Sequence, residues 1–164
     1  MKKMISLMAT IAAMVIIGCG GDDEKTAEGA FDCSGIFPNG HDGICWSDKA
    51  ADLMNWDDAK TYCKNLGGHL PTIDELRTLI INCPGTETGG ACKVSDPAHL
   101  AFSESDDCYC DGSAESHSVF GDTGWTWSSS VQSDSTDGAW LVLFSSGSVG
   151  TYYKSSNIYV RCVR

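Results

Sequence analysis

The cysteines carry most of the chemistry that this sequence could perform, because thiolates bind zinc, act as nucleophiles or close disulfides. Their spacing contains no Cys-x-x-Cys pair, so a zinc site is not predicted. Cys108 and Cys110 could form a redox pair, but no basic neighbour or helix N-terminus is visible that would activate a thiol. Structural disulfides are the favoured role, and they would use Cys33, Cys45, Cys63, Cys83, Cys92, Cys108, Cys110 and Cys162.

The other residues with catalytic potential are isolated. The histidines His41, His69, His99 and His117 lie outside any nucleophile motif such as Gly-x-Ser-x-Gly, and single histidines usually belong to the surface or the core. An acidic loop could bind a cation through Asp106, Asp107 and Asp111, but carboxylates in such loops are more often solvated. We therefore predict no enzyme activity, no cofactor and no metal site.

The N-terminus has the pattern of a signal peptide, with Lys2 and Lys3 before an apolar run over residues 4–17. This run is shorter than the roughly 20 residues that span a bilayer. Ile16-Ile17-Gly18-Cys19 resembles a bacterial lipobox, which implies cleavage before Cys19 and lipid attachment to its sulfur. We predict a signal peptide over 1–18 and a lipid anchor in a membrane of the bacterial cell envelope, with the outer membrane favoured. An ordinary secreted protein is the alternative.

The charge balance argues against polyanionic partners. The chain has 11 basic and 22 acidic residues, a net charge of −11, and losing the two lysines of the signal peptide makes it −13. Such a charge gives no electrostatic attraction to nucleic acid, so no nucleic-acid partner is predicted. Residues 19–31 lack apolar periodicity and are predicted to be a flexible acidic tether, which leaves 32–164 as the folded domain. The eight cysteines of this domain fit four disulfides in an oxidising compartment.

Two helices are predicted from their caps and apolar spacing. Asn55 can cap a helix with Asp58 three residues further on, and a glycine pair ends it. Thr72 and Glu75 form the capping box of a second helix, which ends before Pro84. The apolar faces are Trp56, Ala59, Cys63 and Leu66 in the first helix and Ile73, Leu76, Leu79 and Ile80 in the second.

The second half of the domain is predicted to be rich in β-structure. Residues 86–124 show neither helical nor strand periodicity and are predicted to be a long, cross-linked loop region. Strands are predicted over 125–128, 139–144, 149–153 and 158–163. Helices followed by strands indicate an α+β domain with a twisted antiparallel sheet.

Two groups of residues resemble a known family. The stretches Trp56–Cys63 and Leu66–Ile73, followed by Glu75-Leu76, resemble the two-helix opening of a C-type lectin-like domain. The C-terminal half resembles the Lcl C-terminal domain family, whose founder is a collagen-like bacterial adhesin. The matching residues there are Trp127–Ser130, Ala139-Trp140, Val142, Phe144, Gly147, Val149 and Tyr159–Arg164.

The resemblance implies a C-type lectin-like fold in which the first helix is tied to the last strand, pairing Cys63 with Cys162. Cys33 and Cys45 would then close an N-terminal hairpin. The four remaining cysteines stay undetermined, except that Cys108 and Cys110 are too close to bridge each other and each reaches Cys83 or Cys92. The calcium-binding triplets of true C-type lectins, such as Glu-Pro-Asn and Trp-Asn-Asp, are absent, so no calcium–sugar site is predicted.

A binding face is predicted near the last strands. In the resemblance, Trp140, Val142 and Phe144 point inward, so the period of two places Leu141 and Leu143 on the opposite face. That face is either a binding surface or is covered by the long loop. The predicted binding residues are Gln132, Asp134, Asp137, Leu141, Leu143, Tyr152, Tyr153, Ser155 and Asn157, rich in the residue types of adaptable binding loops. The core is predicted to hold Trp125, Trp127 and Trp140.

Three functions fit these patterns. The favoured one is a non-enzymatic recognition module on a lipid anchor, exposed at the cell surface or in the periplasm. It would be an adhesin or receptor for a neutral glycan or a protein, since the negative charge repels sulfated polysaccharides. The second is a variable receptor diversified by a retroelement, because such elements often mutate the last segment of lectin-like lipoproteins. The third is an envelope-structural protein or an enzyme with no visible motif.

Overall fold

A computed structural model of the chain describes residues 32–94, 108–110, 116–133 and 135–164. No helix in these described ranges is long and apolar enough to cross a membrane. The predictions that fall on other residues lie outside the described ranges: the signal peptide, Cys19, the tether, His99, Asp106, Asp107, Asp111 and Asp134.

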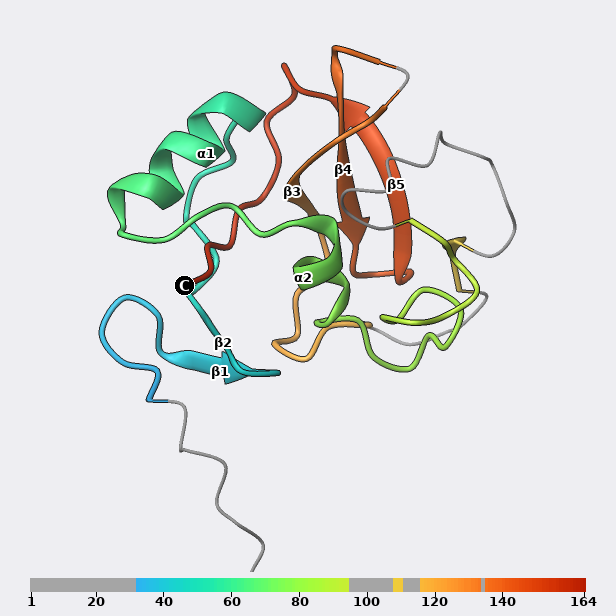
Figure 1. Cartoon of the computed structure of the whole chain (residues 1–164), viewed down its shortest axis with the longest axis horizontal. Coiled ribbons are helices and arrows are strands. Elements are labelled where there is room, and N and C mark those ends of the chain that lie inside the picture. The colour runs from blue at the N-terminus through green and yellow to red at the C-terminus, as the bar shows by residue number, and fades with distance from the viewer. Residues whose placement is uncertain (1–31, 95–107, 111–115, 134) are drawn as a thin grey trace, which may run out of the picture. The chain divides into compact units, whose positions relative to one another are not determined.

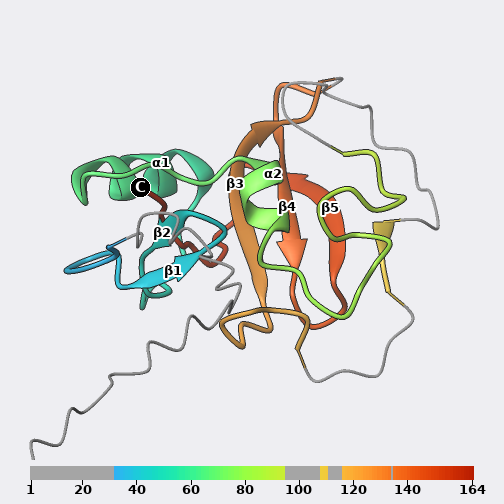
Figure 2. The same cartoon turned by 60° about the horizontal axis from the view of Figure 1, so that its bottom comes forward.

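The described residues form two helices and two antiparallel sheets, which confirms the α+β class (Figure 1). A short hairpin pairs β1 with β2, and a three-stranded sheet has the order β3-β4-β5 (Figure 2). The elements are β1 Asn39–His41, β2 Ile44–Trp46, α1 Trp56–Asn65, α2 Ile73–Arg77, β3 Trp125–Val131, β4 Gly138–Leu143 and β5 Ser148–Tyr153.

Both helices begin where the caps predict. The side chain of Asn55 accepts a hydrogen bond from the Asp58 N–H, and Thr72 and Glu75 form a reciprocal capping box. The second helix is shorter than predicted, because the N–H groups of the residues after Arg77 donate to carbonyls three residues back, which tightens the chain into turns. Leu79 and Ile80 remain buried in those turns, so their apolar spacing is explained without helix.

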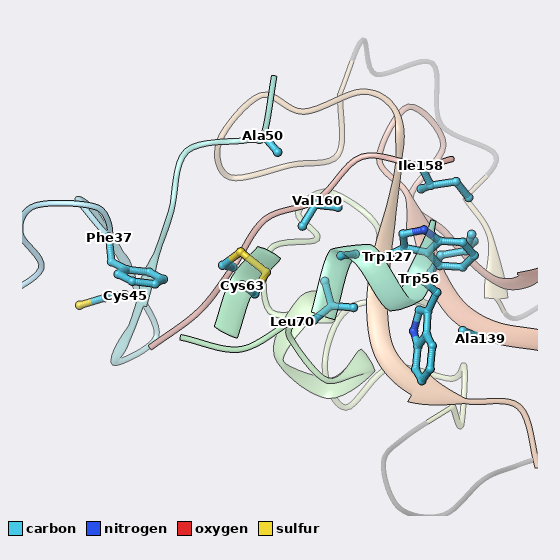
Figure 3. Close-up of a cluster of buried hydrophobic side chains, with 13 residues drawn as sticks. Phe37, Cys45, Ala50, Trp56, Cys63, Leu70, Trp127, Ala139, Ile158 and Val160 are labelled. Carbon is cyan, nitrogen blue, oxygen red and sulfur yellow. A yellow bond between two sulfur atoms is a disulfide. The ribbon is translucent and has the colours of Figure 1, made fainter. Parts of the chain in front are cut away.

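Strand β4 is buried on both faces, which contradicts the prediction that Leu141 is exposed. Leu141 is 1% exposed and lies in a core cluster with Trp56 and Cys63 of α1. Ala139 of β4 and Trp127 of β3 belong to the same cluster (Figure 3). Leu143 is half-buried. The alternate residues Trp140 and Val142 belong to a second cluster with residues of α2. Among the described residues, Leu141 is covered by the buried face of α1 and by Ile158 and Val160 of the C-terminal segment, which belong to the same cluster.

The segment 158–163 does not form the predicted fourth strand of the sheet. Its backbone makes single bridges to several different segments, including a parallel one between Thr126 and Tyr159 and antiparallel ones from Met54 to Ile158 and from His69 to Val163. The β-branched residues that predicted a strand are buried here for another reason. Ile158 and Val160 pack in the first cluster with residues of α1 and β3 (Figure 3), and Val163 packs in the second cluster with Trp46 and residues of α2.

All eight cysteines of the domain form disulfides. The pairs Cys33–Cys45 and Cys63–Cys162 are those that the resemblance implies, and the second joins α1 to the C-terminal segment across 99 residues. The two pairs that the sequence left undetermined are Cys83–Cys110 and Cys92–Cys108. Four disulfides are typical of a domain that folds in an oxidising compartment outside the cytoplasm.

Two buried arginines organise segments that lack secondary structure. The Arg77 guanidinium donates to the carbonyls of Thr86, Glu87, Cys92 and Val94, and its burial lowers the pKa of Arg77 below the usual value, opposed in part by Asp74. Arg161 donates from Nε and Nη2 to Asp122 at 2.5 and 3.1 Å, and from Nη1 to the Ser47 carbonyl at 2.7 Å. These hydrogen bonds satisfy charges that burial would otherwise make costly.

Candidate ligand-binding face

The most exposed aromatic residues of the described chain are adjacent. Tyr152 and Tyr153 end strand β5, with 52% and 68% of their surfaces exposed. Their ring centroids lie 5.9 Å apart in an edge-to-face arrangement. The two rings are therefore in contact with each other at the end of β5. We call Tyr152 and Tyr153 the tyrosine pair.

The register of the sheet explains why the tyrosine pair stays exposed. Tyr152 lies opposite Ala139 and Tyr153 lies opposite Gly138 on β4. Neither partner has a side chain large enough to cover a ring. An added Cβ at Gly138 would lie 2.4 Å from Gln132 Oε1, so a larger residue there would displace the end of the Gln132 side chain. The sequence therefore places a large, rigid contact surface at a position where the fold leaves it uncovered.

Trp125 belongs to the surface, which contradicts its predicted place in the core. Trp127 and Trp140 are buried as predicted, but Trp125 is 40% exposed. The strand period alone cannot separate Trp125 from Trp127, because both lie on the same face of β3. They differ because α1 packs near Trp127, whose indole N–H donates to the Met54 carbonyl, while Trp125 stands at the uncovered end of the strand.

Trp125 and Tyr152 share one face of the sheet. Trp125 lies opposite Leu143, and Tyr152 lies opposite Ala139. Leu143 and Ala139 are four residues apart on β4, so the period of two puts all of these side chains on the same side. Both aromatic residues line a pocket of about 420 Å³, which we call the tryptophan pocket. Its other lining residues are Ser156, Asn157 and Ile158.

Two further depressions adjoin the tyrosine pair. The larger, of about 850 Å³, lies between Tyr153 and the start of α1 and contains charged side chains. Its lining residues are Asn55–Asp58, Thr136, Asp137, Tyr153, Lys154 and Ser155. The smaller, of about 340 Å³, is lined by Gln132, Ser135, Gly138, Thr151 and the tyrosine pair. These volumes are in the range that holds small ligands or side chains of a partner.

The structure thus brings most of the predicted binding residues together. The ones that line the three depressions are Gln132, Asp137, Tyr152, Tyr153, Ser155 and Asn157. Leu141 is removed from the site by its burial, and Leu143 lines none of the three depressions. Sequence reasoning missed Trp125, Ser156 and the start of α1. The one available signal was that Trp125 is the first residue of a predicted strand, because side chains at the end of a strand are less often buried by neighbouring elements.

Comparison with known families identifies the domain. The model of the Lcl C-terminal domain matches residues 35–164, which is most of the chain. The chain belongs to the Lcl C-terminal domain family. No curated protein matches the sequence significantly. The matched range contains every element described above and all the residues of the candidate face, so this face is part of the Lcl C-terminal domain itself.

In this Lcl C-terminal domain, the contacts of Lys154 fix the position of the chain that follows the tyrosine pair. The carbonyl of Lys154 accepts from the Trp56 N–H at 3.0 Å, and its N–H donates to the Asp137 carbonyl at 2.8 Å. Lys154 Nζ donates to the Thr136 carbonyl and lies 4.6 Å from the Trp56 ring centroid. Lys154 therefore holds the residues after the tyrosine pair against α1 and the loop before β4.

The Lcl C-terminal domain shows no catalytic arrangement in its described residues. His41 contacts the Thr78 carbonyl, His69 contacts Glu75, and His117 contacts the Ile81 carbonyl. Each of these three described histidines thus has a local partner, and none of the three lines the depressions. The described residues also contain no group of three or more His, Cys, Asp or Glu side chains that could hold a metal ion. The candidate face offers aromatic and hydrogen-bonding side chains.

Proposed function

We propose that this Lcl C-terminal domain is a non-enzymatic recognition module of the bacterial cell surface, which binds a glycan or a protein through the face around the tyrosine pair. The observation that carries the proposal is the exposure of Tyr152 and Tyr153 between three depressions on a rigid sheet. Tyrosine gives a large contact area for little loss of conformational entropy, which is why binding loops favour it. An adhesin-like or receptor-like role follows.

The proposed location is a lipid anchor in the cell envelope, with the outer membrane favoured. The lipobox-like sequence ending at Cys19 supports the anchor, and the four disulfides support folding outside the cytoplasm. The acidic segment 19–31 would then hold the domain away from the membrane. In this arrangement the tyrosine pair is available to ligands on other molecules or surfaces.

The proposed fold is of the C-type lectin-like kind. Two observations support it. Cys63 of α1 is joined to Cys162 near the C-terminus. The two ends of the domain also lie side by side, because Cys45 and Arg164 exchange backbone hydrogen bonds of 3.2 and 2.9 Å. Two ends that lie side by side suit a domain that is attached through its N-terminus and presents the opposite side to a ligand.

Replacement of both tyrosines by alanine is expected to weaken ligand binding by about tenfold or more, because two exposed aromatic side chains of a binding site each contribute appreciably to affinity. The measurement is a glycan and surface-protein array probed with the disulfide-bonded full chain, followed by titration of each hit. The Tyr152→Ala/Tyr153→Ala variant should retain the thermal stability of the parent protein, because the rings fill no core space.

The matched control is Tyr109→Ala. Tyr109 is 44% exposed but lies on the disulfide-linked segment 108–110 and lines none of the three depressions. The control should bind as the parent protein does. Binding that is equal in all three proteins would refute the assignment of the site.

A further inference from the structure

We propose that the tryptophan pocket is a calcium-independent site for the ring of a neutral sugar. This inference rests on the proposed recognition function and names the ligand class of one part of its surface. The pocket is the place where an exposed tryptophan and an exposed tyrosine stand on the same sheet face, beside two polar side chains.

The aromatic residues supply the first requirement of sugar binding. A pyranose ring has an apolar face of C–H groups, whose partial positive charge is attracted to the negative face of an aromatic ring. Trp125 and Tyr152 offer such ring surfaces to solvent, at 40% and 52% exposure. Ile158 adds apolar area at the same pocket. The volume of about 420 Å³ is in the range of small-ligand sites and has room for a sugar unit.

The polar residues supply the second requirement. A sugar presents hydroxyl groups around the rim of its ring, and these need hydrogen bonds when they leave water. Asn157 carries both a donor and an acceptor, and Ser156 carries a hydroxyl that can act as either. Neither side chain has a hydrogen-bond partner among the described residues, so both are available to a ligand. A purely apolar ligand would leave these groups unsatisfied.

The charge of the lining selects a neutral ligand. None of the described lining residues of the tryptophan pocket is charged. The neighbouring depression behind Tyr153 differs, because Asp57, Asp58 and Asp137 line it. An anionic sugar would find no basic residue at the tryptophan pocket and would meet the negative charge of the whole domain. A ligand cation would be drawn to the neighbouring depression instead.

Acrylamide quenching of tryptophan fluorescence tests the site directly. Trp46, Trp56, Trp127 and Trp140 are buried, so Trp125 supplies most of the quenchable emission. The probes are maltose, cellobiose and lactose as neutral disaccharides, with heparin as the polyanion, added to the disulfide-bonded full chain. At least one neutral disaccharide should protect Trp125 and lower the quenching constant by about twofold, because the quencher loses access to the covered ring.

Variants separate stacking from other effects, with binding measured by saturation-transfer NMR. Trp125→Ala should weaken binding of the active disaccharide by about tenfold, whereas Trp125→Phe, which keeps an aromatic face, should remain within about threefold of the parent. Tyr109→Ala should leave sugar binding unchanged, because Tyr109 is exposed but does not line the tryptophan pocket. Thermal unfolding confirms that each variant is folded.

The failures of the two proposals are distinguishable. Binding of heparin alone, equal sugar binding in Trp125→Ala, or no binding of any disaccharide at millimolar concentration would overturn the sugar site. Absence of disaccharide binding together with a protein ligand from the array that depends on Tyr153 would overturn the sugar site and support the recognition function. Absence of every array hit together with absence of disaccharide binding would overturn both.

Discussion

Removal of the Cys63–Cys162 disulfide is expected to lower the free energy of unfolding by about 4.7 kcal/mol, the entropic value for a closed loop of roughly 100 residues. The bridge spans 99 residues and ties α1 to the segment that separates this helix from the sheet. Without this bridge the loop of 99 residues is no longer closed, so the conformational entropy of the unfolded chain rises. The test is urea-induced unfolding of the Cys63→Ala/Cys162→Ala variant, with tryptophan fluorescence as the readout.

The matched control for this variant is Cys33→Ala/Cys45→Ala. That bridge closes only 12 residues, so its removal should cost less, about 3 kcal/mol or below in the same entropic description. A larger loss from the short bridge than from the long one would show that contacts in the folded state, and not loop closure, govern the contribution of these disulfides.

Loss of the carboxylate of Asp122 is expected to destabilise the domain by about 3–5 kcal/mol, because it leaves a buried guanidinium without its counter-charge. Asp122 and Arg161 are both buried, and two hydrogen bonds join them. The measurement is the free energy of unfolding of Asp122→Asn, which keeps the size of the side chain. The charge of Arg161 stays in place in this variant, so the loss reports the uncompensated charge.

Two further variants make this prediction specific. Lys49 lies 3.5 Å from the same carboxylate but is partly exposed, so Lys49→Met should cost at most about 1 kcal/mol. Replacing both buried partners, as Asp122→Leu with Arg161→Met, should recover part of the stability that Asp122→Asn loses, because no charge is then buried. A double variant as unstable as the sum of its single variants would contradict the account.

The sequence predicts those parts of the fold that local chemistry determines. The caps at Asn55 and Thr72 define the starts of α1 and α2, because cap residues act on backbone groups within one turn. The strand period identifies β3, β4 and β5. The pairing of the last four cysteines was not predictable, because Cys108 and Cys110 are near neighbours in the chain and either could reach either partner.

The failures at the candidate site have a common cause. Leu141 was predicted to be exposed and Trp125 to be buried, and both predictions are wrong. The strand period correctly assigns each of them to a face of the sheet. It contains no information on how far α1 extends over that face, because this depends on contacts between residues distant in sequence. The exposed end of the face, where Trp125 stands, is therefore visible only in the folded domain.

The pairing of the tyrosines with small residues has a consequence for evolution. Since Ala139 and Gly138 lie opposite them, exchange of Tyr152 or Tyr153 for another residue opens no cavity and breaks no core contact. Substitutions at such surface positions usually change stability by less than about 0.5 kcal/mol. Lineages can therefore change the chemistry of this surface while the disulfide-bonded scaffold keeps its stability, so that ligand preference and folding evolve separately.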